Sequence, residues 1–364
     1  MTVQSICELI EEVAPLALQE SYDNAGLLVG DSQMEVSSVL VCIDVTEFVI
    51  DEAIQKKCNL IISHHPLIFS GLKRITGQNE IQRCVSKALK NDIAIYAAHT
   101  NLDNVLSGVS GKMAEKIGLK NIRILQPLEG KLLKLVTYVT KIHSFAVRDA
   151  LFEAGAGQIG NYDSCSFNAE GFGTFRANKQ ANPYVGKIDE LHSESETRIE
   201  VIVPDYLKSK IVNSLLKSHP YEEPAFDLIP LNNKWNTVGA GILGELEVAE
   251  EALTFLNRLK IIFNVPSIRH TKVTDKKIKL VALCGGSGSS FIPDAIMAGA
   301  DLYITGDIKY HEFFDAQNRI LIADIGHFES EQFTKDIFYE IITKKMPTFA
   351  VQISESKTNP INYL

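Results

Sequence analysis

Two adjacent histidines, His64 and His65, directly follow a predicted strand at Leu60–Ile62. In a regular strand, neighbouring side chains point to opposite faces, so both imidazoles can address one site only where the strand is ending. Pro66 supports such an ending, because a proline holds the preceding residue in an extended conformation. Neutral imidazole is a common transition-metal ligand. The pair is a candidate metal-binding element, and the alternative is two ordinary polar residues at a strand end.

A second candidate cluster, AAHTNLDN at Ala97–Asn104, also follows a predicted strand and carries His99 and Asp103. These two side chains offer an imidazole and a carboxylate, which are both frequent metal ligands. The alternative is a helix-entry loop, in which Asp103 or Asn104 caps the helix that follows.

A third cluster, IADIGHFESE at Ile322–Glu331, contains His327 and Glu331 four residues apart just after a predicted strand. In a helix, residues at this spacing share one face, so the two side chains form a reasonable pair of metal ligands. The alternative is an exposed first turn whose acidic residues are stabilised by the helix dipole.

A fourth cluster, YITGDIKYHEF at Tyr303–Phe313, supplies Asp307 and His311. Asp307 follows a strand and is placed to cap the next helix, whereas His311 is a candidate for a supporting or a surface position. The glycine-rich loop CGGSGSS at Cys284–Ser290 lies between a strand and a helix. Its amides could hold an anion, with a simple tight turn as the alternative.

Taken together, the four clusters indicate one site. Each lies just past the carboxyl end of a predicted strand, which is the edge of an open α/β sheet where ligands gather. Several histidines with two carboxylates exceed what one zinc ion needs, and a structural zinc site would favour cysteines. The mixture suits a dinuclear centre in which a carboxylate bridges two ions, as in many metallohydrolases.

The elements that position these clusters belong to two parts of the chain. Residues 1–126 and 235–364 alternate strands with helices, which predicts one layered α/β core with parallel strands, including one long helix at Phe328–Lys344. Residues 127–234 read as βαββαβ, the ferredoxin-like order, with the polar segment Gly171–Ser195 as a long excursion. We therefore predict an α/β core interrupted by an inserted α+β domain.

Composition narrows the class of protein. The chain has 364 residues and a formal charge of −9, which disfavours nucleic-acid binding through phosphate neutralisation. It has no apolar run of membrane-spanning length and no pattern typical of a secretory signal. The six cysteines are scattered without a CxxC pair, as expected for reduced thiols. We expect a cytoplasmic protein.

Beyond these residue patterns, the motifs resemble the Nif-three-like family, whose members are often named GTP cyclohydrolase I type 2 homologues. The insert resembles that of the long bacterial form, which is similar to PII and CutA-type domains. The resemblance covers essentially the whole chain. The matching segments are SYDNAGLLVGD (Ser21–Asp31), ISHHPLIF (Ile62–Phe69), AHTNLDN (Ala98–Asn104), GGSGSS, TGDIKYHE (Thr305–Glu312), GHFESE (Gly326–Glu331), and, in the insert, GQIGNYDSCSF (Gly157–Phe167) and HPYEEPAFD (His219–Asp227).

This resemblance implies two divalent metal ions per subunit, with zinc as the first choice and iron or manganese as alternatives. It leaves His99 and Asp307 as proton-transfer or supporting candidates, and His311 as a supporting candidate. It also implies a toroidal homohexamer. The ligands that it implies are His64, His65, Asp103, His327 and Glu331, with Glu331 as the bridge.

The function expected from these observations is hydrolysis of a small nucleotide-like or heterocyclic substrate by a metal-dependent enzyme. The alternative is a non-enzymatic metal-binding regulatory or scaffold protein, whose insert senses a small ligand. No membrane partner is expected, and nucleic-acid binding is disfavoured.

Overall fold

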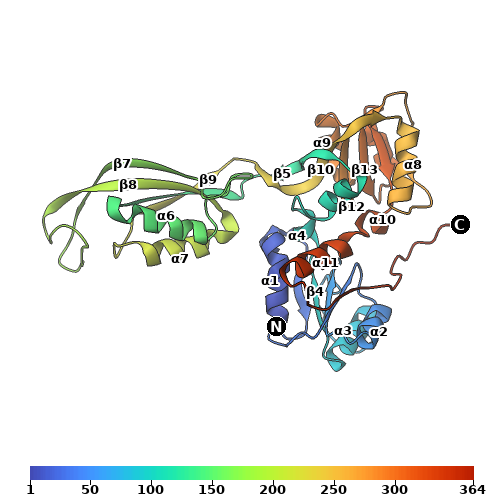
Figure 1. The fold of residues 1–364 in the computed structure, drawn as a ribbon, viewed down its shortest axis with the longest axis horizontal. Coiled ribbons are helices and arrows are strands. Elements are labelled where there is room, and N and C mark those ends of the chain that lie inside the picture. The colour runs from blue at the N-terminus through green and yellow to red at the C-terminus, as the bar shows by residue number, and fades with distance from the viewer. The chain divides into compact units, whose positions relative to one another are not determined.

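The computed structural model describes residues 1–364 and divides into two compact units (Figure 1). The first unit combines Met1–Pro127 with Thr237–Leu364, and the second is Leu128–Asn236. The expected boundaries, after residues 126 and 234, differ from these by one and two residues. The chain therefore leaves the first unit once and returns to it once. None of the helices combines the length and apolar composition that a membrane crossing requires.

The N-terminal part of the first unit is built on a five-stranded sheet with the order β1-β4-β3-β2-β15. Strands β2, β3 and β4 are parallel, and β1 pairs with β4 in the antiparallel direction. Strand β15 comes from near the C-terminus and pairs in parallel with β2. The strand bounds are β1 Gly26–Val29, β2 Val39–Cys42, β3 Leu60–Ser63, β4 Ala94–Ala97 and β15 Val351–Ile353.

Helices α2 and α3 of this part begin at residues whose side chains cap them. The Thr46 side chain accepts a hydrogen bond from the Val49 amide, and Asn79 does the same for the Gln82 amide. The helices are α1 Val3–Val13, α2 Glu47–Gln55, α3 Glu80–Lys90, α4 Thr100–Asp103, α5 Val109–Ile117 and α11 Thr334–Lys345.

The C-terminal part of the first unit has a six-stranded sheet with the order β11-β14-β13-β12-β10-β5. Strands β12, β13 and β14 are parallel, whereas β10 runs antiparallel to β12. The strand bounds are β5 Lys120–Leu128, β10 Trp235–Glu250, β11 Arg269–His270, β12 Ile278–Ser287, β13 Leu302–Gly306 and β14 Leu321–Asp324. The helices here are α8 Ala252–Ile262, α9 Ile292–Met297 and α10 His327–Glu331.

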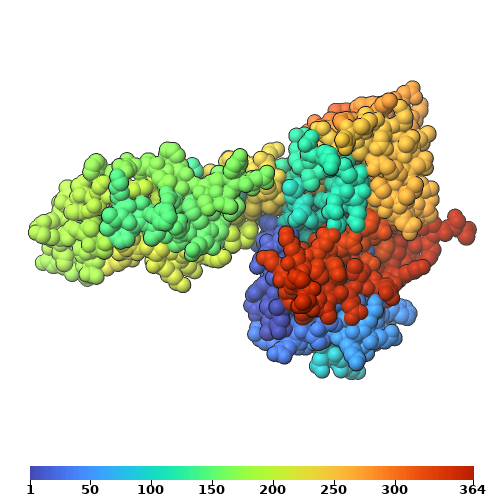
Figure 2. Space-filling model, in the orientation of Figure 1, coloured from blue at the N-terminus to red at the C-terminus, as the bar shows by residue number.

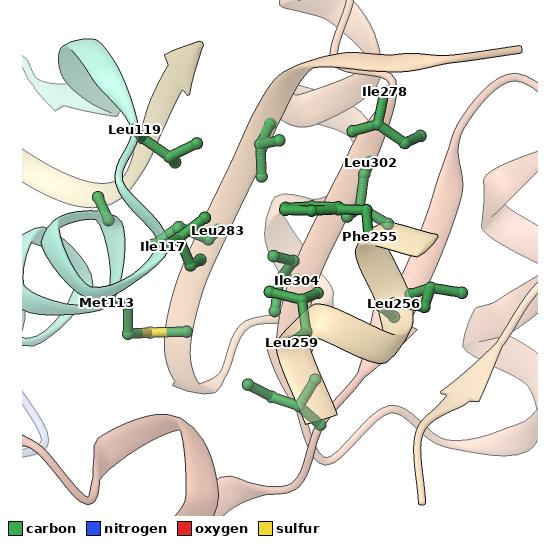
Figure 3. Close-up of a cluster of buried hydrophobic side chains, with 14 of the residues drawn as sticks. Met113, Ile117, Leu119, Phe255, Leu256, Leu259, Ile278, Leu283, Leu302 and Ile304 are labelled. Carbon is green, nitrogen blue, oxygen red and sulfur yellow. The ribbon is translucent and has the colours of Figure 1, made fainter. Parts of the chain in front are cut away.

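A shared hydrophobic core ties the two parts of the first unit together (Figure 3). Phe255 and Leu259 of α8 are fully buried against Leu302 and Ile304 of β13. Met113 of α5 joins the same cluster from the N-terminal part of the chain. Burying apolar area is the dominant favourable term in folding, so this core holds α5 against the C-terminal sheet.

The second unit has the ferredoxin-like order βαββαβ and a four-stranded antiparallel sheet ordered β7-β8-β6-β9. Its own core places Val147 and Leu151 of α6 and Ile211 and Leu215 of α7 on one face of the sheet. The elements are β6 Leu132–Thr140, α6 Ser144–Glu153, β7 Ser166–Arg176, β8 Leu191–Pro204, α7 Lys208–Ser218 and β9 Phe226–Leu231.

Two local predictions were wrong. The two ends of the predicted excursion at Gly171–Ser195 belong to the long strands β7 and β8, which pair up to Arg176 and Leu191. No residue of β7 is buried, so the strand lacks the apolar alternation that identifies strands in a sequence. The predicted helix at Phe328–Lys344 is two helices, interrupted at residues 332–333. There the Gln332 side chain donates to the Phe263 and Glu329 carbonyl oxygens.

Candidate metal centre

The structure brings the five expected ligands together at the carboxyl ends of strands from both sheets of the first unit. His64 and His65 follow β3, and Asp103 ends the short helix α4 after β4. His327 and Glu331 lie on α10, which follows β14. Parallel strands place their carboxyl ends at one edge, which is why separate segments of the sequence meet there.

His64 is fully buried and has a fixed tautomer. Its Nδ1 donates to the Ala98 carbonyl oxygen over 2.9 Å. Its Nε2 is the nitrogen left for a metal ion, and lies 3.5 Å from Glu331 Oε1 and 3.8 Å from Asp103 Oδ1. A metal-binding imidazole typically donates its other ring N–H to a backbone carbonyl or a carboxylate in this way.

His65 and His327 converge on the same carboxylate. Their Nε2 atoms lie 3.0 Å and 3.2 Å from Glu331 Oε2, and 3.3 Å from each other. Each ring is supported from behind, because His65 Nδ1 contacts Asp44 at 2.7 Å and His327 Nδ1 contacts Asp307 at 2.6 Å. A carboxylate behind an imidazole is the usual support of a metal-binding histidine.

Three buried polar atoms at the centre of this cluster have no hydrogen-bond partner: His64 Nε2, Asp103 Oδ1 and Glu331 Oε2. Glu331 Oε2 lies close to the two imidazoles without hydrogen-bond geometry to either. An unpaired buried polar atom is costly, and three that converge indicate a missing partner. Nitrogen and oxygen lone pairs that face one another fit a divalent cation, so the donor set suits the expected metal.

Mutual electrostatics stabilise the charged forms of several groups. Burial alone would lower the pKa of His65, but Asp44 and Glu331 raise it to about 10. The pKa of His327 rises to about 9 against the same effect of burial, because of Glu331 and Asp307. Burial raises the pKa of the Asp103 carboxyl. The pKa of Glu331 falls well below its usual value, because its histidine neighbours outweigh burial.

His99 stands beside the cluster, with its ring 5.2 Å from that of His64 and 5.4 Å from that of His65. Donor atoms of these three histidines lie within 4.8 Å of one another, so they form a second group that could hold a metal ion. His99 Nδ1 donates to Asp23 Oδ1 over 2.8 Å, and the Thr100 amide donates to Asp23 Oδ2 over 3.0 Å. These hydrogen bonds lower the pKa of Asp23 despite its burial.

Sequence reasoning missed two supporting carboxylates, Asp23 and Asp44. Asp44 follows β2 by two residues, a position equivalent to that of His65 after β3, so the strand-end rule could have found it. Asp307 supports His327, and the cap of the next turn is Lys309 instead. His311 is exposed, and its ring packs against Tyr310 at 5.1 Å.

The glycine-rich segment predicted as a loop at Cys284–Ser290 begins within β12, which continues to Ser287, and two of its amides are already paired. The Gly285 amide donates to the Ser110 hydroxyl over 3.2 Å, and the Gly286 amide to the Ser330 hydroxyl over 2.8 Å. A Cβ on Gly286 would lie 2.3 Å from Glu331 Oε1. The loop therefore provides space for the Glu331 carboxylate, in addition to a turn.

The fold and the cluster define an α/β protein with a candidate metal centre at its strand ends. The model of the Duf34/NIF3 (NGG1p interacting factor 3) family matches residues 1–360. The chain belongs to this family.

Relatives match over nearly the full length. The Halalkalibacterium halodurans protein named GTP cyclohydrolase 1 type 2 homolog is 40% identical over 366 residues, which cover 99% of this chain and 98% of that one. A Bacillus cereus protein related to NIF3 has a solved structure with a TM-score of 0.86 and 38% identity, covering 100% of this chain and 99% of that one. A Staphylococcus aureus structure has a TM-score of 0.79 and 32% identity, with the same coverage.

The glycine loop yields a test of the Glu331 position. Gly286→Ala forces a Cβ into the space of the Glu331 carboxylate, so we expect metal affinity to fall by about tenfold or more, as for other changes that displace a ligand. Gly299→Ala is a matched control, because Gly299 also has a positive φ but nothing within 4 Å of its Cβ position. Both variants share a backbone cost of about 1–3 kcal/mol. Equal metal affinity in both variants, measured by competition with a chelator, would contradict this account.

The histidine pKa values predict how pH affects the metal-free protein. The folded-state pKa values of His65 and His327, about 10 and about 9, exceed the ordinary 6.5. Their contribution to stability is therefore complete below about pH 6.5 and is lost as the pH rises through 9 to 10. We expect calorimetric melting of chelator-treated protein to show this loss, and His65→Gln/His327→Gln to reduce it. An equal pH dependence in the variant would show that these residues are not responsible.

Proposed function

We propose that this protein is a metal-dependent hydrolase with a dinuclear centre held by His64, His65, Asp103, His327 and Glu331. The observation that carries the proposal is the convergence of three buried, unpartnered donor atoms from three separate segments of the chain. Histidine and carboxylate ligands suit several divalent ions, with zinc first and iron or manganese as alternatives. The position of Glu331, with one oxygen toward His64 and the other toward His65 and His327, supports a bridging role.

Two such ions, when bound, lower the pKa of water toward neutrality and polarise the bond that is attacked. The chain itself supplies the proton carrier. Asp23 accepts a hydrogen bond from His99 Nδ1, which leaves Nε2 as the free nitrogen of a ring that lies beside that of His64. We assign the proton transfer to His99. Asp307, the other candidate, is engaged with His327 and serves to orient that ring.

The substrate that we propose is a small nucleotide-like or heterocyclic molecule. Support comes from relatives such as the Bacillus subtilis protein, 38% identical over 371 residues, which is named GTP cyclohydrolase 1 type 2 homolog. Hydrolytic opening of a purine ring is one reaction of this class. It needs an activated water and a proton donor, which the metal ligands and His99 would provide.

One observation favours a second role. The inserted unit contains its own cavity of about 690 Å³, lined only by residues of that unit. A regulatory or scaffold protein that binds metal ions in one unit and a small ligand in the other would have such a cavity. In that case the metal ions would stabilise the protein without catalysing a reaction.

The double variant His64→Ala/Glu331→Ala tests the proposed centre. We expect it to lose bound metal, measured by elemental analysis, and to lose hydrolysis in a screen of metal-loaded protein against nucleotides, phosphodiesters and cyclic amides. His311→Ala, an exposed histidine from the neighbouring turn, is the control and retains both. Hydrolysis that survives the double change would refute this site. Tight metal binding without any hydrolysis by the unmodified protein would favour the scaffold role.

A further inference from the structure

Two exposed aromatic rings lie beside the candidate metal centre. Tyr22 belongs to the turn before β1, and Phe69 lies in the segment that follows β3 and its two histidines. Tyr22 is 64% exposed and Phe69 is 51% exposed, and their ring centroids lie 6.4 Å apart. Exposed apolar rings that gather beside a candidate site are typical of ligand-binding surfaces.

The two rings lead from the protein surface to the proposed ligands. The Phe69 ring lies 6.5 Å from that of His99, at an interplanar angle of 77°. The His99 ring lies 5.4 Å from that of His65. Aromatic rings in contact have centroid separations of about 4.5–7 Å, so these rings form a continuous series. A planar molecule held on Phe69 is therefore adjacent to His99, the proposed proton carrier.

Hydrogen bonds of the residues after Tyr22 fix the position of this turn. Asp23 accepts a hydrogen bond from His99 Nδ1 over 2.8 Å. The Asn24 side-chain amide donates to the carbonyl oxygen of the residue that precedes Phe69. The second of these bonds joins the two segments that carry the rings. The backbone beside both rings is thus held by contacts that also hold His99.

The Tyr22 hydroxyl adds a polar group to this apolar surface. Partial burial raises the pKa of this hydroxyl, and nearby carboxylates, which include that of Asp103, raise it further. The hydroxyl therefore stays neutral and can donate a hydrogen bond. An aromatic surface with a neutral donor suits a planar heterocycle, because the face of such a ring stacks and its edge accepts hydrogen bonds.

We propose that Tyr22 and Phe69 bind the base of a nucleotide by stacking, and thereby place its ring beside His99 and the proposed metal ions. The inference rests on the proposed function, since it names the part of the substrate that the protein recognises. Every base has a π-face, so stacking on aromatic side chains tolerates different bases. The rings therefore select planar heterocycles as a class.

GMP and ribose 5-phosphate are the probes, because they share the sugar and the phosphate and differ by the base. Calorimetric titration of the full-length, zinc-loaded protein measures the affinity of each. We expect GMP to bind at least about fivefold more tightly, which is the lower end of the contribution of one stacked base. Phe69→Leu removes the aromatic face but keeps an apolar side chain, and should reduce this preference. Phe69→Trp should preserve it.

Further variants separate stacking from other effects. Tyr22→Ala should reduce the preference for GMP, whereas Tyr22→Phe should retain its stacking part. Phe145→Leu, which changes an exposed phenylalanine of the inserted unit, is the control and should leave the preference unchanged. Phe69→Trp also provides a fluorescent reporter, because the chain has only one tryptophan of its own, Trp235. GMP should quench the emission of the new indole, and ribose 5-phosphate should not.

Two results would overturn this inference. One is the absence of any preference for GMP over ribose 5-phosphate in the unmodified protein. The other is an unchanged preference in Phe69→Leu and Tyr22→Ala proteins that circular dichroism shows to be folded. Failure of the proposed function has a different result, because base-dependent binding would persist while the metal-loaded protein hydrolysed no compound of the screen.

A separate observation concerns the C-terminal tail, residues 354–364, within the first unit. Figure 2 shows the C-terminal part of the chain, in red, beside the N-terminal part, in blue, with which it pairs through β15 and β2. The Thr358 hydroxyl donates to Asp44 Oδ2 over 2.7 Å. The other oxygen of Asp44 lies 2.7 Å from His65 Nδ1. Contacts thus lead from Thr358 through Asp44 to a proposed metal ligand.

Neighbouring residues hold the tail on both sides of Thr358. The Ser356 hydroxyl donates to Glu52 Oε2 of α2 over 2.6 Å. The Asn359 side-chain amide donates over 3.0 Å to Oε1 of Glu329, a buried residue of α10. Because the residues on either side are anchored, the Thr358 hydroxyl is kept in place.

We infer that Thr358 is a positioning residue for His65 and acts through Asp44. This inference rests on the proposed metal centre. Losing a direct partner of a ligand histidine weakens metal affinity by about 10- to 100-fold, and Thr358 acts one bond further away. We therefore expect Thr358→Val, which removes one hydroxyl at nearly constant volume, to weaken it by about threefold to tenfold. Thr358→Ser should restore the affinity. Thr343→Val, whose hydroxyl bonds only within α11, is the control.

Two readouts do not depend on catalysis: metal dissociation into a chelator, and the visible spectrum of cobalt-loaded protein. We expect faster dissociation and an altered spectrum for Thr358→Val alone among these variants. Dissociation and a spectrum that match those of the unmodified protein would overturn the inference on Thr358 and leave the metal centre intact. Failure of the unmodified protein to bind metal would instead contradict the proposed centre, and this inference with it.

Discussion

The buried carboxylate of Glu331 is the group on which the rest of the first unit depends. An isolated charge inside a protein is costly, and it persists only where opposite charges and hydrogen bonds compensate for it. Here the compensation comes from three histidines that approach both of its oxygens. Two of these histidines are themselves held by Asp44 and Asp307. The positions of Asp44 and Asp307 thus follow from the need to stabilise the buried charge of Glu331.

That requirement explains why the first unit is built from both ends of the chain. His64 and His65 come from the N-terminal sheet, and His327 and Glu331 follow a strand of the C-terminal sheet. Neither sheet alone would hold the carboxylate and its histidine partners. The parallel pairing of β15 with β2 and the hydrogen bond from Thr358 of the tail to Asp44 connect the C-terminal part of the chain to the N-terminal sheet.

The inserted unit follows a different physical design. Its helices cover one face of the sheet, and the other face carries aromatic and acidic side chains around a cavity. Because it has its own core, it can be inserted between β5 and β10 without disturbing the strand ends that hold the histidines. Glycines at Gly171 and Gly173 provide space there, as Gly286 does beside Glu331.

The sequence alone determined which chemistry-bearing residues lie at strand ends, because a strand and the turn after it are encoded by adjacent residues. His64, Asp103 and Glu331 were identified in this way, together with the α/β core and the βαββαβ order of the insert. The lengths of β7 and β8 were underestimated, because a projecting hairpin has no buried face to impose alternation.

Only the tertiary structure decided which groups support the proposed ligands. Asp44 and Thr358 are 314 residues apart, and their hydrogen bond depends on strand pairing that no local pattern encodes. The hydrogen bond from the Gly286 amide to Ser330 likewise depends on the packing of segments that are far apart in the sequence. Short-range rules place a residue at an edge of a sheet, whereas its partners depend on how distant segments pack.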